Sequence, residues 1–471
     1  MCLLPVIQLN LFYSFINFSQ WSMLFNSLSI IFLLCLWNIF FNVFQFSKNY
    51  MKDFSAYFNS MLVMFMFSMI TLIISDSWLM LFMGWEFLGV TSFFLILYYN
   101  NWNSLSGALL TMMTNRLGDM FFILSMLFFL SLFKSFMMLI IIMMMSLTKS
   151  AQVPFSGWLP AAMAAPTPVS SLVHSSTLVT AGIYVYFRFN IFMNYTFNKL
   201  MMLFFLLTML LGSLSALMEE DLKKLIAFST LSQLGLIFLS FYSSFVGLMF
   251  FHLFVHAFFK SILFIVGGMM IWSMNSSQLL SNCSKLDLSI MTILVLSLIN
   301  MMSLMFSSGF LSKESLSLLF MFKSIKFVIV IIMIFFLTLA YTWRLMNFMF
   351  NNFTKTKSII NFNTFSVELK YMVFMIFFGK MWTNNWFYSL SWSFIFKMML
   401  IIMLIMLILF KYIYSFIFLD LLLINFIFSK MSLLKIEKDS FNSFFYFLES
   451  YMMKLQNWKM VMLLTLVLVF F

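Results

Sequence analysis

Long apolar stretches without acidic residues recur along this chain, and they constrain its fold more than any other feature. Two of them lie at 22–44 (SMLFNSLSIIFLLCLWNIFFNVF) and 324–343 (SIKFVIVIIMIFFLTLAYTW). Each has the length of about 20 residues that an α-helix needs to cross a bilayer. Only 8% of the 471 residues are charged, against about a quarter in soluble domains. A water-soluble fold could not bury this much apolar surface.

The pattern favours helices over a membrane barrel. Backbone groups in lipid must be paired internally, and barrel strands alternate polar and apolar residues, which these stretches do not. We therefore predict an all-α polytopic membrane protein with about 14 to 15 transmembrane helices. The expected spans are 3–18, 22–46, 54–75, 77–98, 105–131, 134–152, 161–188, 199–218, 222–242, 245–272, 287–310, 312–347 (more than one element), 366–379, 393–418 and 458–471. Residues 419–457 mix charges with aromatics, as expected of a helix lying along the membrane surface.

Other compositional features exclude several classes of site. The first residues, MCLLPVIQLN, predict no cleavable signal peptide. The three cysteines form no CxxC pair, and no GxGxxG or haem motif occurs, so we expect no metal or redox cofactor bound by this chain. The net charge of +12 fits basic side chains at helix ends that contact lipid headgroups, including anionic lipid such as cardiolipin. It forms no basic patch for nucleic acid.

Ionisable residues within the apolar stretches are the candidate functional groups, because each costs about 2.5 to 3.5 kcal/mol at membrane depth. His252, His256 and Lys260 recur every four residues, which places them on one helix face. No carboxylate or cysteine stands at a matching spacing, so a proton relay is favoured over a metal site. The complete set is Glu86, Arg116, Asp119, Lys149, His174, Lys223, Lys224, His252, His256, Lys260, Lys313 and Glu314.

Structural roles are open alternatives for some of these groups. Arg116 and Asp119 are three residues apart and could form only a structural ion pair. Lys223 and Lys224 follow three acidic residues, and at least one of them is expected to be a solvated charge at a helix start.

Helix-breaking residues accompany two of the lysines. Pro154 and Pro160 follow Lys149 and should break its helix, while Pro166 and Pro168 should bend the next helix ahead of His174. Gly309, after two serines, precedes Lys313. Broken membrane helices mark ion sites in transporters, often at corresponding positions of two repeats. The spacing of Lys149 and Lys313 suggests a duplicated unit of about five helices.

Several segments together carry a family resemblance. GWEFLGVTSF, NRLGD, KSAQVPFSGWLPAAMAAPTPVSSLVHSSTLVTAGIY, DLKKLIAFSTLSQLG, FHLFVHAFFKSILF and GFLSKE closely resemble the antiporter-like membrane subunits of respiratory complex I, which are similar to Mrp-type sodium/proton antiporter subunits. The resemblance implies two inverted five-helix repeats, each with a discontinuous helix, and a C-terminal lateral helix. The implied parts are shortened N-terminal helices at 1–53, repeats at 54–188 and 189–347, and C-terminal helices at 348–471, with the lateral helix near 419–457 and a last membrane helix at 458–471.

The resemblance also implies roles for single residues. Glu86, Lys149, His174, Lys223, His252, His256 and Lys313 match the family's proton-relay positions, and Arg116 with Asp119 matches its ion pair. Lys260 and Glu314 are supporting residues, with Glu314 standing where the family commonly has Asp. Proton pumping would be coupled to NADH:ubiquinone electron transfer in the mitochondrial inner membrane, and the gene would be mitochondrial.

The same resemblance implies the partners and cofactors. The partners would be the other membrane subunits of the complex, above all a neighbouring antiporter-like subunit. FMN, iron–sulfur clusters and NADH would be bound by partner subunits, and ubiquinone would act at the level of the complex. A stand-alone cation/proton antiporter subunit and a non-pumping scaffold are the alternative functions.

Overall fold

The structure is a computed structural model that describes residues 23, 25–51, 56–130, 135–189, 198–242, 246–273, 277–280, 288–303, 307–309, 312–313 and 325–351. The helices expected at 3–18, 366–379, 393–418 and 458–471, the surface helix at 419–457, and Glu314 all lie outside these residues.

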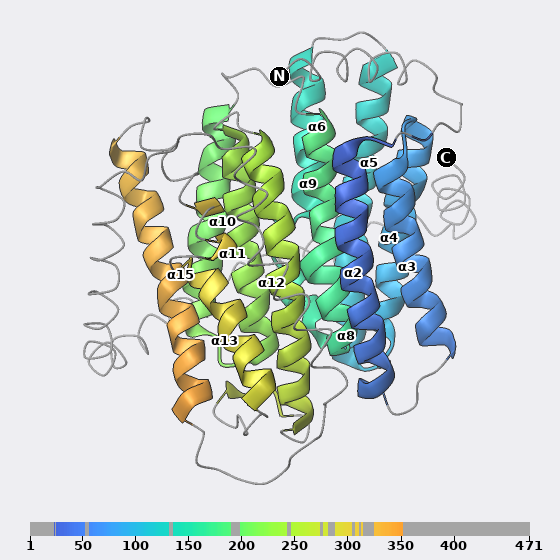
Figure 1. The fold of residues 1–471 in the computed structure, drawn as a ribbon. Coiled ribbons are helices and arrows are strands. Elements are labelled where there is room, and N and C mark those ends of the chain that lie inside the picture. The colour runs from blue at the N-terminus through green and yellow to red at the C-terminus, as the bar shows by residue number, and fades with distance from the viewer. Residues whose placement is uncertain are drawn as a thin grey trace, which may run out of the picture. The chain divides into compact units, whose positions relative to one another are not determined.

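The described part of the chain is helical and contains no β-strand, only two isolated bridges. The elements are α2 (Ser27–Tyr50), α3 (Ala56–Ile74), α4 (Trp78–Leu97), α5 (Trp102–Leu130), α6 (Ser135–Lys149), α7 (Trp158–Ala161), η1 (Ala162–Ala164), α8 (Thr167–Val169), η2 (Ser170–Thr177), α9 (Leu178–Phe189), α10 (Asn198–Met218), α11 (Leu222–Tyr242), α12 (Val246–Ser273), α13 (Leu288–Met302) and α15 (Ile325–Asn351). Figure 1 shows the long helices packed alongside one another.

Six of the described helices are long and apolar enough to cross a membrane: α2, α3, α4, α11, α12 and α15. Shorter apolar helices occur at 140–149, 202–218 and 291–302. The prediction of an all-α membrane protein is therefore confirmed. The division into two five-helix repeats stays a prediction.

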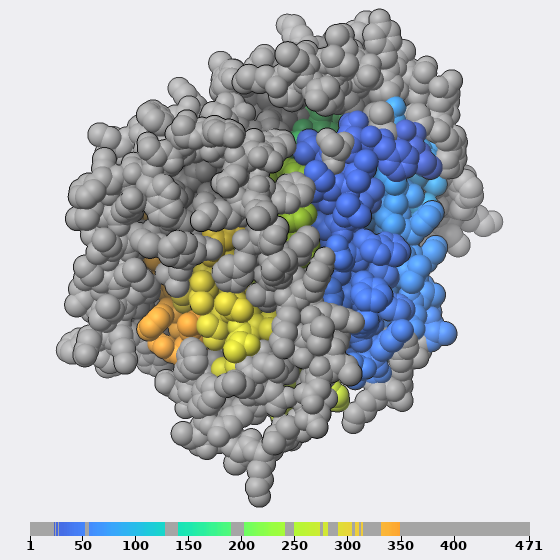
Figure 2. Space-filling view, in the orientation of Figure 1, coloured from blue at the N-terminus to red at the C-terminus, as the bar shows by residue number. Residues whose placement is uncertain are grey.

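Burial separates central helices from peripheral ones. In α11 and α12, 89% of the span is buried, against 39% in α2 and 44% in α3. Figure 2 shows α2 and α3 at the surface of one face. Large apolar side chains such as Leu34 and Phe67 are exposed there, as expected of helices that face lipid, whereas α11 and α12 provide sites shielded from it.

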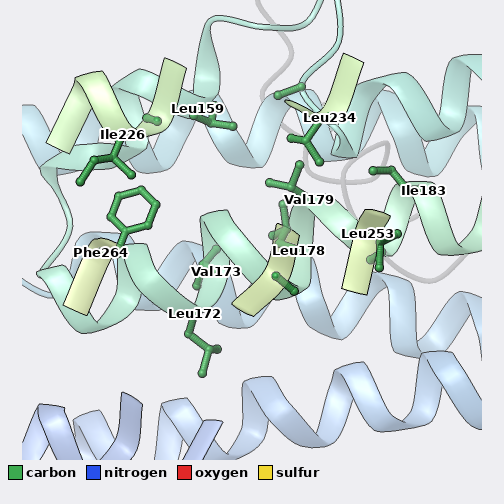
Figure 3. Close-up of a cluster of buried hydrophobic side chains, with 14 of the residues drawn as sticks. Leu159, Leu172, Val173, Leu178, Val179, Ile183, Ile226, Leu234, Leu253 and Phe264 are labelled. Carbon is green, nitrogen blue, oxygen red and sulfur yellow. The ribbon is translucent and has the colours of Figure 1, made fainter. Parts of the chain in front are cut away.

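A buried apolar cluster joins α11 and α12 to the segment that follows the first helix break. It contains Leu159 from α7, Leu172 and Val173 from the π-helix η2, Ile226 from α11 and Phe264 from α12 (Figure 3). Helix α12 contacts η2, α8 and α2 as well as α11 and α13. This packing fixes the position of η2, which carries His174.

The first break lies directly after Lys149. Helix α6 ends at this residue after 15 residues, or about 22 Å at 1.5 Å per residue, which is shorter than the roughly 30 Å hydrocarbon core. The chain then turns, with Ala151 at a φ of 55°, and passes Pro154 before re-forming helix at Trp158.

The single helix expected at 161–188 is wrong. Four short elements, α7, η1, α8 and η2, precede α9. Pro166 caps α8 and Pro168 stands in its first turn, where a missing N–H costs nothing. These prolines start a helix instead of bending one. The irregular backbone ahead of and around His174 is the π-helix Ser170–Thr177.

The second break differs from the first in the position of its lysine. Helix α13 ends at Met302, and Ser303 follows with a φ of 60°. A Cβ at Gly309 would overlap the carbonyl oxygen of Asn300, so the chain returns against its own helix end there. Lys313 follows this break, whereas Lys149 precedes the first one. The repeat of about five helices suggested by the spacing of the two lysines stays a prediction.

Candidate functional site

Lys149 lies buried against Trp85 of α4. Its Nζ donates to the Trp85 carbonyl oxygen at 2.5 Å and lies 4.1 Å from the centroid of the Trp85 ring. The side chain is 0% exposed. A close approach of α9 supports this position, since a Cβ at Gly182 would lie 2.8 Å from the Ser146 carbonyl oxygen. The amine is held by a carbonyl group and a ring face, both uncharged.

The carboxylates form a separate cluster with Arg116. Nη1 of Arg116 is 3.1 Å from Oε1 of Glu86 and 3.5 Å from Oδ2 of Asp119. The side chains of Arg116 and Glu86 are 46% and 35% exposed, so this pair is at the periphery of the described chain. Glu86 thus pairs with Arg116 and not with Lys149. Asp119 also accepts a hydrogen bond from the Trp85 indole Nε1 at 2.9 Å.

His174 lies in the π-helix η2, and neither ring nitrogen hydrogen-bonds to a described side chain; the neighbouring polar group is the backbone of Ala162. The residue is fully buried, and its ring centroid is 6.0 Å from that of Trp158. No direct hydrogen bond joins it to Lys149 within the described residues. A proton moving between the two would require water or a side-chain movement.

Lys223 and Lys224 have opposite environments. Nζ of Lys223 donates to the Ala165 carbonyl oxygen at 2.9 Å, and the residue is 4% exposed. Lys224 pairs with Asp221 at 2.5 Å, and its side chain is 44% exposed. Lys224 is thus the solvated charge at the start of α11, while Lys223 contacts the segment that follows the first break.

A cavity of about 520 Å³ adjoins this region. The starts of α5 and α11, together with α7 and η1, line it, and its walls include Asn101, Ser104, Ala161, Ala164 and Lys224. The cavity is partly open. One wall includes Ala164, the neighbour of Ala165, whose carbonyl oxygen accepts the hydrogen bond from Lys223.

The stripe on α12 is buried along its whole length. His252, His256 and Lys260 are each 0% exposed. Lys260 donates from Nζ to Oγ of Ser229 on α11 at 2.6 Å, and both ring nitrogens of His256 lack a partner among the described groups. The sequence-based placement of the three on one face agrees with this packing.

His252 connects the stripe to the second break. Its Nδ1 is 2.8 Å from Oγ of Ser312, with the direction of the hydrogen bond set by the histidine tautomer. The adjacent Lys313 donates from Nζ to the Met301 carbonyl oxygen at 2.7 Å. Met301 is in the last turn of α13. The break therefore supplies both the hydroxyl for the histidine and the carbonyl for the lysine.

Four side chains in these contacts were not predicted from the sequence: Trp85, Trp158, Ser229 and Ser312. Trp85 stands beside Glu86 and could have been suspected from that position, whereas the two serines have no distinguishing signal among many others. In the part of the chain that the structure describes, no group of three or more His, Cys, Asp or Glu side chains could hold a metal ion.

Comparisons with known proteins agree with this architecture. The sequence profile of the NADH:quinone oxidoreductase/Mrp antiporter transmembrane family matches residues 75–340. NADH-ubiquinone oxidoreductase chain 5 of Caenorhabditis elegans is 38% identical over 407 residues, which cover 81% of this chain and 76% of that protein. The chain 5 protein of Ascaris suum is 40% identical over 381 residues, covering 76% and 68%.

Solved structures share the fold at low sequence identity. A chain of the Mrp complex from Dietzia sp. DQ12-45-1b aligns with a TM-score of 0.73 at 20% identity, covering 87% of this chain and 53% of that one. A chain of the membrane-bound sulfane sulfur reductase, an archaeal respiratory membrane complex, aligns with a TM-score of 0.69 at 17% identity, covering 81% and 88%. With the profile match and the relatives above, the chain belongs to the NADH:quinone oxidoreductase/Mrp antiporter family, in the group of NADH-ubiquinone oxidoreductase chain 5.

Proposed function

We propose that this chain is the proton-translocating membrane subunit of NADH:ubiquinone oxidoreductase, in which electron transfer drives protons across the mitochondrial inner membrane. Its relatives bear the name of that enzyme, and its fold is that of Mrp antiporter subunits. The redox chemistry belongs to partner subunits that hold NADH, FMN, iron–sulfur clusters and ubiquinone. This chain contributes the membrane path for protons.

The observation that carries the proposal is a set of buried amines and imidazoles without carboxylate partners among the described residues. The hydrogen bonds of Lys149, Lys223 and Lys313 all go to backbone carbonyl oxygens, and Lys260 binds a hydroxyl. A carbonyl or hydroxyl stabilises a positive charge less than a carboxylate does. The protonation of such groups therefore responds to hydration and to nearby charge, as a pump requires.

The proposed path follows the buried groups in order. Lys149 and His174 form the first part, with Glu86, Arg116 and Asp119 as the charge cluster beside them. Lys223 joins this part to the stripe His252, His256 and Lys260, whose members are one helical turn apart, and Ser312 leads from His252 to Lys313. Steps without a direct hydrogen bond are bridged by water. The cavity beside Lys224 gives solvent access near Lys223.

The remaining assignments extend the same proposal. We infer two antiporter-like repeats at 54–188 and 189–347, N-terminal helices at 1–53 and C-terminal helices at 348–471, with Glu314 supporting Lys313. The exposed pair of Glu86 and Arg116 suits contact with a neighbouring antiporter-like subunit, because a charged pair facing lipid is costly. Lipid partners would include cardiolipin, and the gene would be mitochondrial.

The test is Lys149→Met in the assembled complex, reconstituted in liposomes, with NADH oxidation and proton uptake measured together. Lys48→Met is the matched control, because Lys48 is an exposed lysine in the last turn of α2. We expect a lower proton-to-electron ratio in Lys149→Met, normal assembly, and no change in the control.

Two outcomes would favour other functions. A lower yield of assembled complex with an unchanged ratio would identify the chain as a scaffold. Sodium-dependent proton exchange by the isolated chain in liposomes would support a stand-alone antiporter.

A further inference from the structure

We propose that Trp85 is a positioning residue that keeps the ammonium group of Lys149 apart from the carboxylate of Asp119, and that its displacement allows a proton to pass between them. The proposal rests on the proposed function, since it assigns a gate within the first part of the path.

Trp85 contacts both charged groups with different parts of its structure. Its carbonyl oxygen accepts the hydrogen bond from Nζ of Lys149 at 2.5 Å, and the centroid of its ring lies 4.1 Å from the same Nζ. Its indole Nε1 donates to Oδ1 of Asp119 at 2.9 Å. Trp85 is 0% exposed, so water does not compete for these contacts at the indole.

Trp85 therefore stabilises the ammonium group of Lys149 and the carboxylate of Asp119 through different parts of its ring. The face of an indole ring attracts a cation, and its N–H edge attracts an anion. The second carboxylate oxygen of Asp119 lies 3.5 Å from Arg116. In a buried site a lysine and an aspartate would otherwise attract each other strongly. Here the indole ring contacts both groups, and its interactions take the place of a direct ion pair between Lys149 and Asp119.

The chemistry of indole prevents proton transfer through Trp85 in this arrangement. The Nε1–H group donates a hydrogen bond but has no lone pair available to accept a proton. A proton therefore cannot pass through Trp85 from Asp119 to Lys149. When the indole N–H releases Asp119, its carboxylate can reach the ammonium group of Lys149, and one N–H proton moves to a carboxylate oxygen to give a neutral carboxyl group and a neutral amine. The reverse step restores the carboxylate and the ammonium group.

A purely structural role makes a different prediction. Trp85 packs near Phe122, with ring centroids 5.8 Å apart, and any well-fitting aromatic ring would serve that packing. Phenylalanine at position 85 keeps the ring face and the backbone carbonyl but removes the N–H. Trp85→Phe therefore tests the role of the indole N–H while an aromatic ring still fills the space beside Phe122.

The experiment compares Trp85→Phe with Trp78→Phe in the assembled, reconstituted complex. Trp78 is on the same helix, is also 0% exposed, and stacks on Phe189. In Trp85→Phe the freed carboxylate pairs with Lys149, so we expect the proton-to-electron ratio to fall to the value of Lys149→Met. The pH profile of pumping should move to higher pH, because the paired carboxylate stabilises the ammonium. Trp78→Phe should change neither quantity.

A double variant identifies Asp119 as the group through which Trp85 acts. In an Asp119→Asn background, Trp85→Phe should cause no further fall in the ratio. The proposal is overturned if Trp85→Phe behaves like Trp78→Phe, or if its full effect persists in the Asp119→Asn background. If Trp85→Phe assembles poorly, the test is Asp119→Asn with an intact Trp85. Unchanged pumping in that variant would show that Asp119 is not the proton partner of Lys149 and would overturn the proposal.

This outcome is separable from failure of the proposed function. If Lys149→Met pumps normally, the relay itself is wrong. If Lys149→Met loses pumping while Trp85→Phe pumps normally, the relay stands and only the gate is wrong.

Discussion

The two adjacent lysines at the start of α11 provide a sharp test of the relay, since they differ in environment but not in chemistry. Lys223→Met removes a buried amine that donates to the Ala165 carbonyl oxygen at 2.9 Å. A hydrogen bond from a charged group contributes about 1.5 to 3 kcal/mol, equivalent to roughly a ten- to hundredfold change in an equilibrium constant. Lys224→Met breaks an exposed ion pair with Asp221, which contributes at most about 1 kcal/mol.

The assay measures the proton-to-electron ratio and the thermal stability of the assembled complex for both variants. Lys223→Met should lower the ratio and loosen the segment after the first break, which hydrogen exchange of residues 158–177 would report. Lys224→Met should leave the ratio unchanged. Equal ratios in the two variants would refute the reasoning, because burial would then not distinguish a relay lysine from a solvated one.

Two further predictions concern the geometry around the breaks. Ser312→Ala removes the hydroxyl that lies 2.8 Å from Nδ1 of His252. The loss should lower the local stability of α12 by about 1 to 3 kcal/mol, which would appear as faster hydrogen exchange in that helix. Ser297→Ala is the control, because Ser297 is buried and hydrogen-bonded within its own helix, and it should not speed this exchange. Gly182→Ala should lower the thermal stability of the complex by about 1 to 3 kcal/mol, because its Cβ would lie 2.8 Å from the Ser146 carbonyl oxygen, whereas Gly89→Ala, with its nearest atom at 3.6 Å, should be tolerated.

The sequence predicted the class of the protein and most of its titratable groups for a clear physical reason. A lysine or histidine within an apolar span is too costly to be accidental, and seven of the predicted lysines and histidines, such as Lys149 and His256, are buried in the structure. Helix length and apolar composition likewise placed α3 and α12 within two residues at each end. These properties depend on local sequence alone.

The partners of those groups could not be predicted, because they depend on packing between distant helices. Glu86 is 30 residues from Arg116 and Lys149 is 64 from Trp85, and no periodicity relates such positions. The π-helix was missed for a similar reason. Its position depends on packing against the distant helices α12 and α2, while its sequence, SSLVHSST, has no breaker of its own.

Helix α11 links the two groups of buried titratable residues. Its first turn binds the segment after the first break through Lys223, and two turns later Ser229 accepts the hydrogen bond from Lys260 on α12. One turn beyond, Gln233 donates to the hydroxyl of Tyr341 on α15 at 3.4 Å. The helix rises about 9 Å between Lys223 and Ser229, too far for direct proton transfer. A shift of α11 along its axis would nevertheless change the contacts of Lys223 and Lys260 together, so this buried helix is the element best placed to make their protonation interdependent.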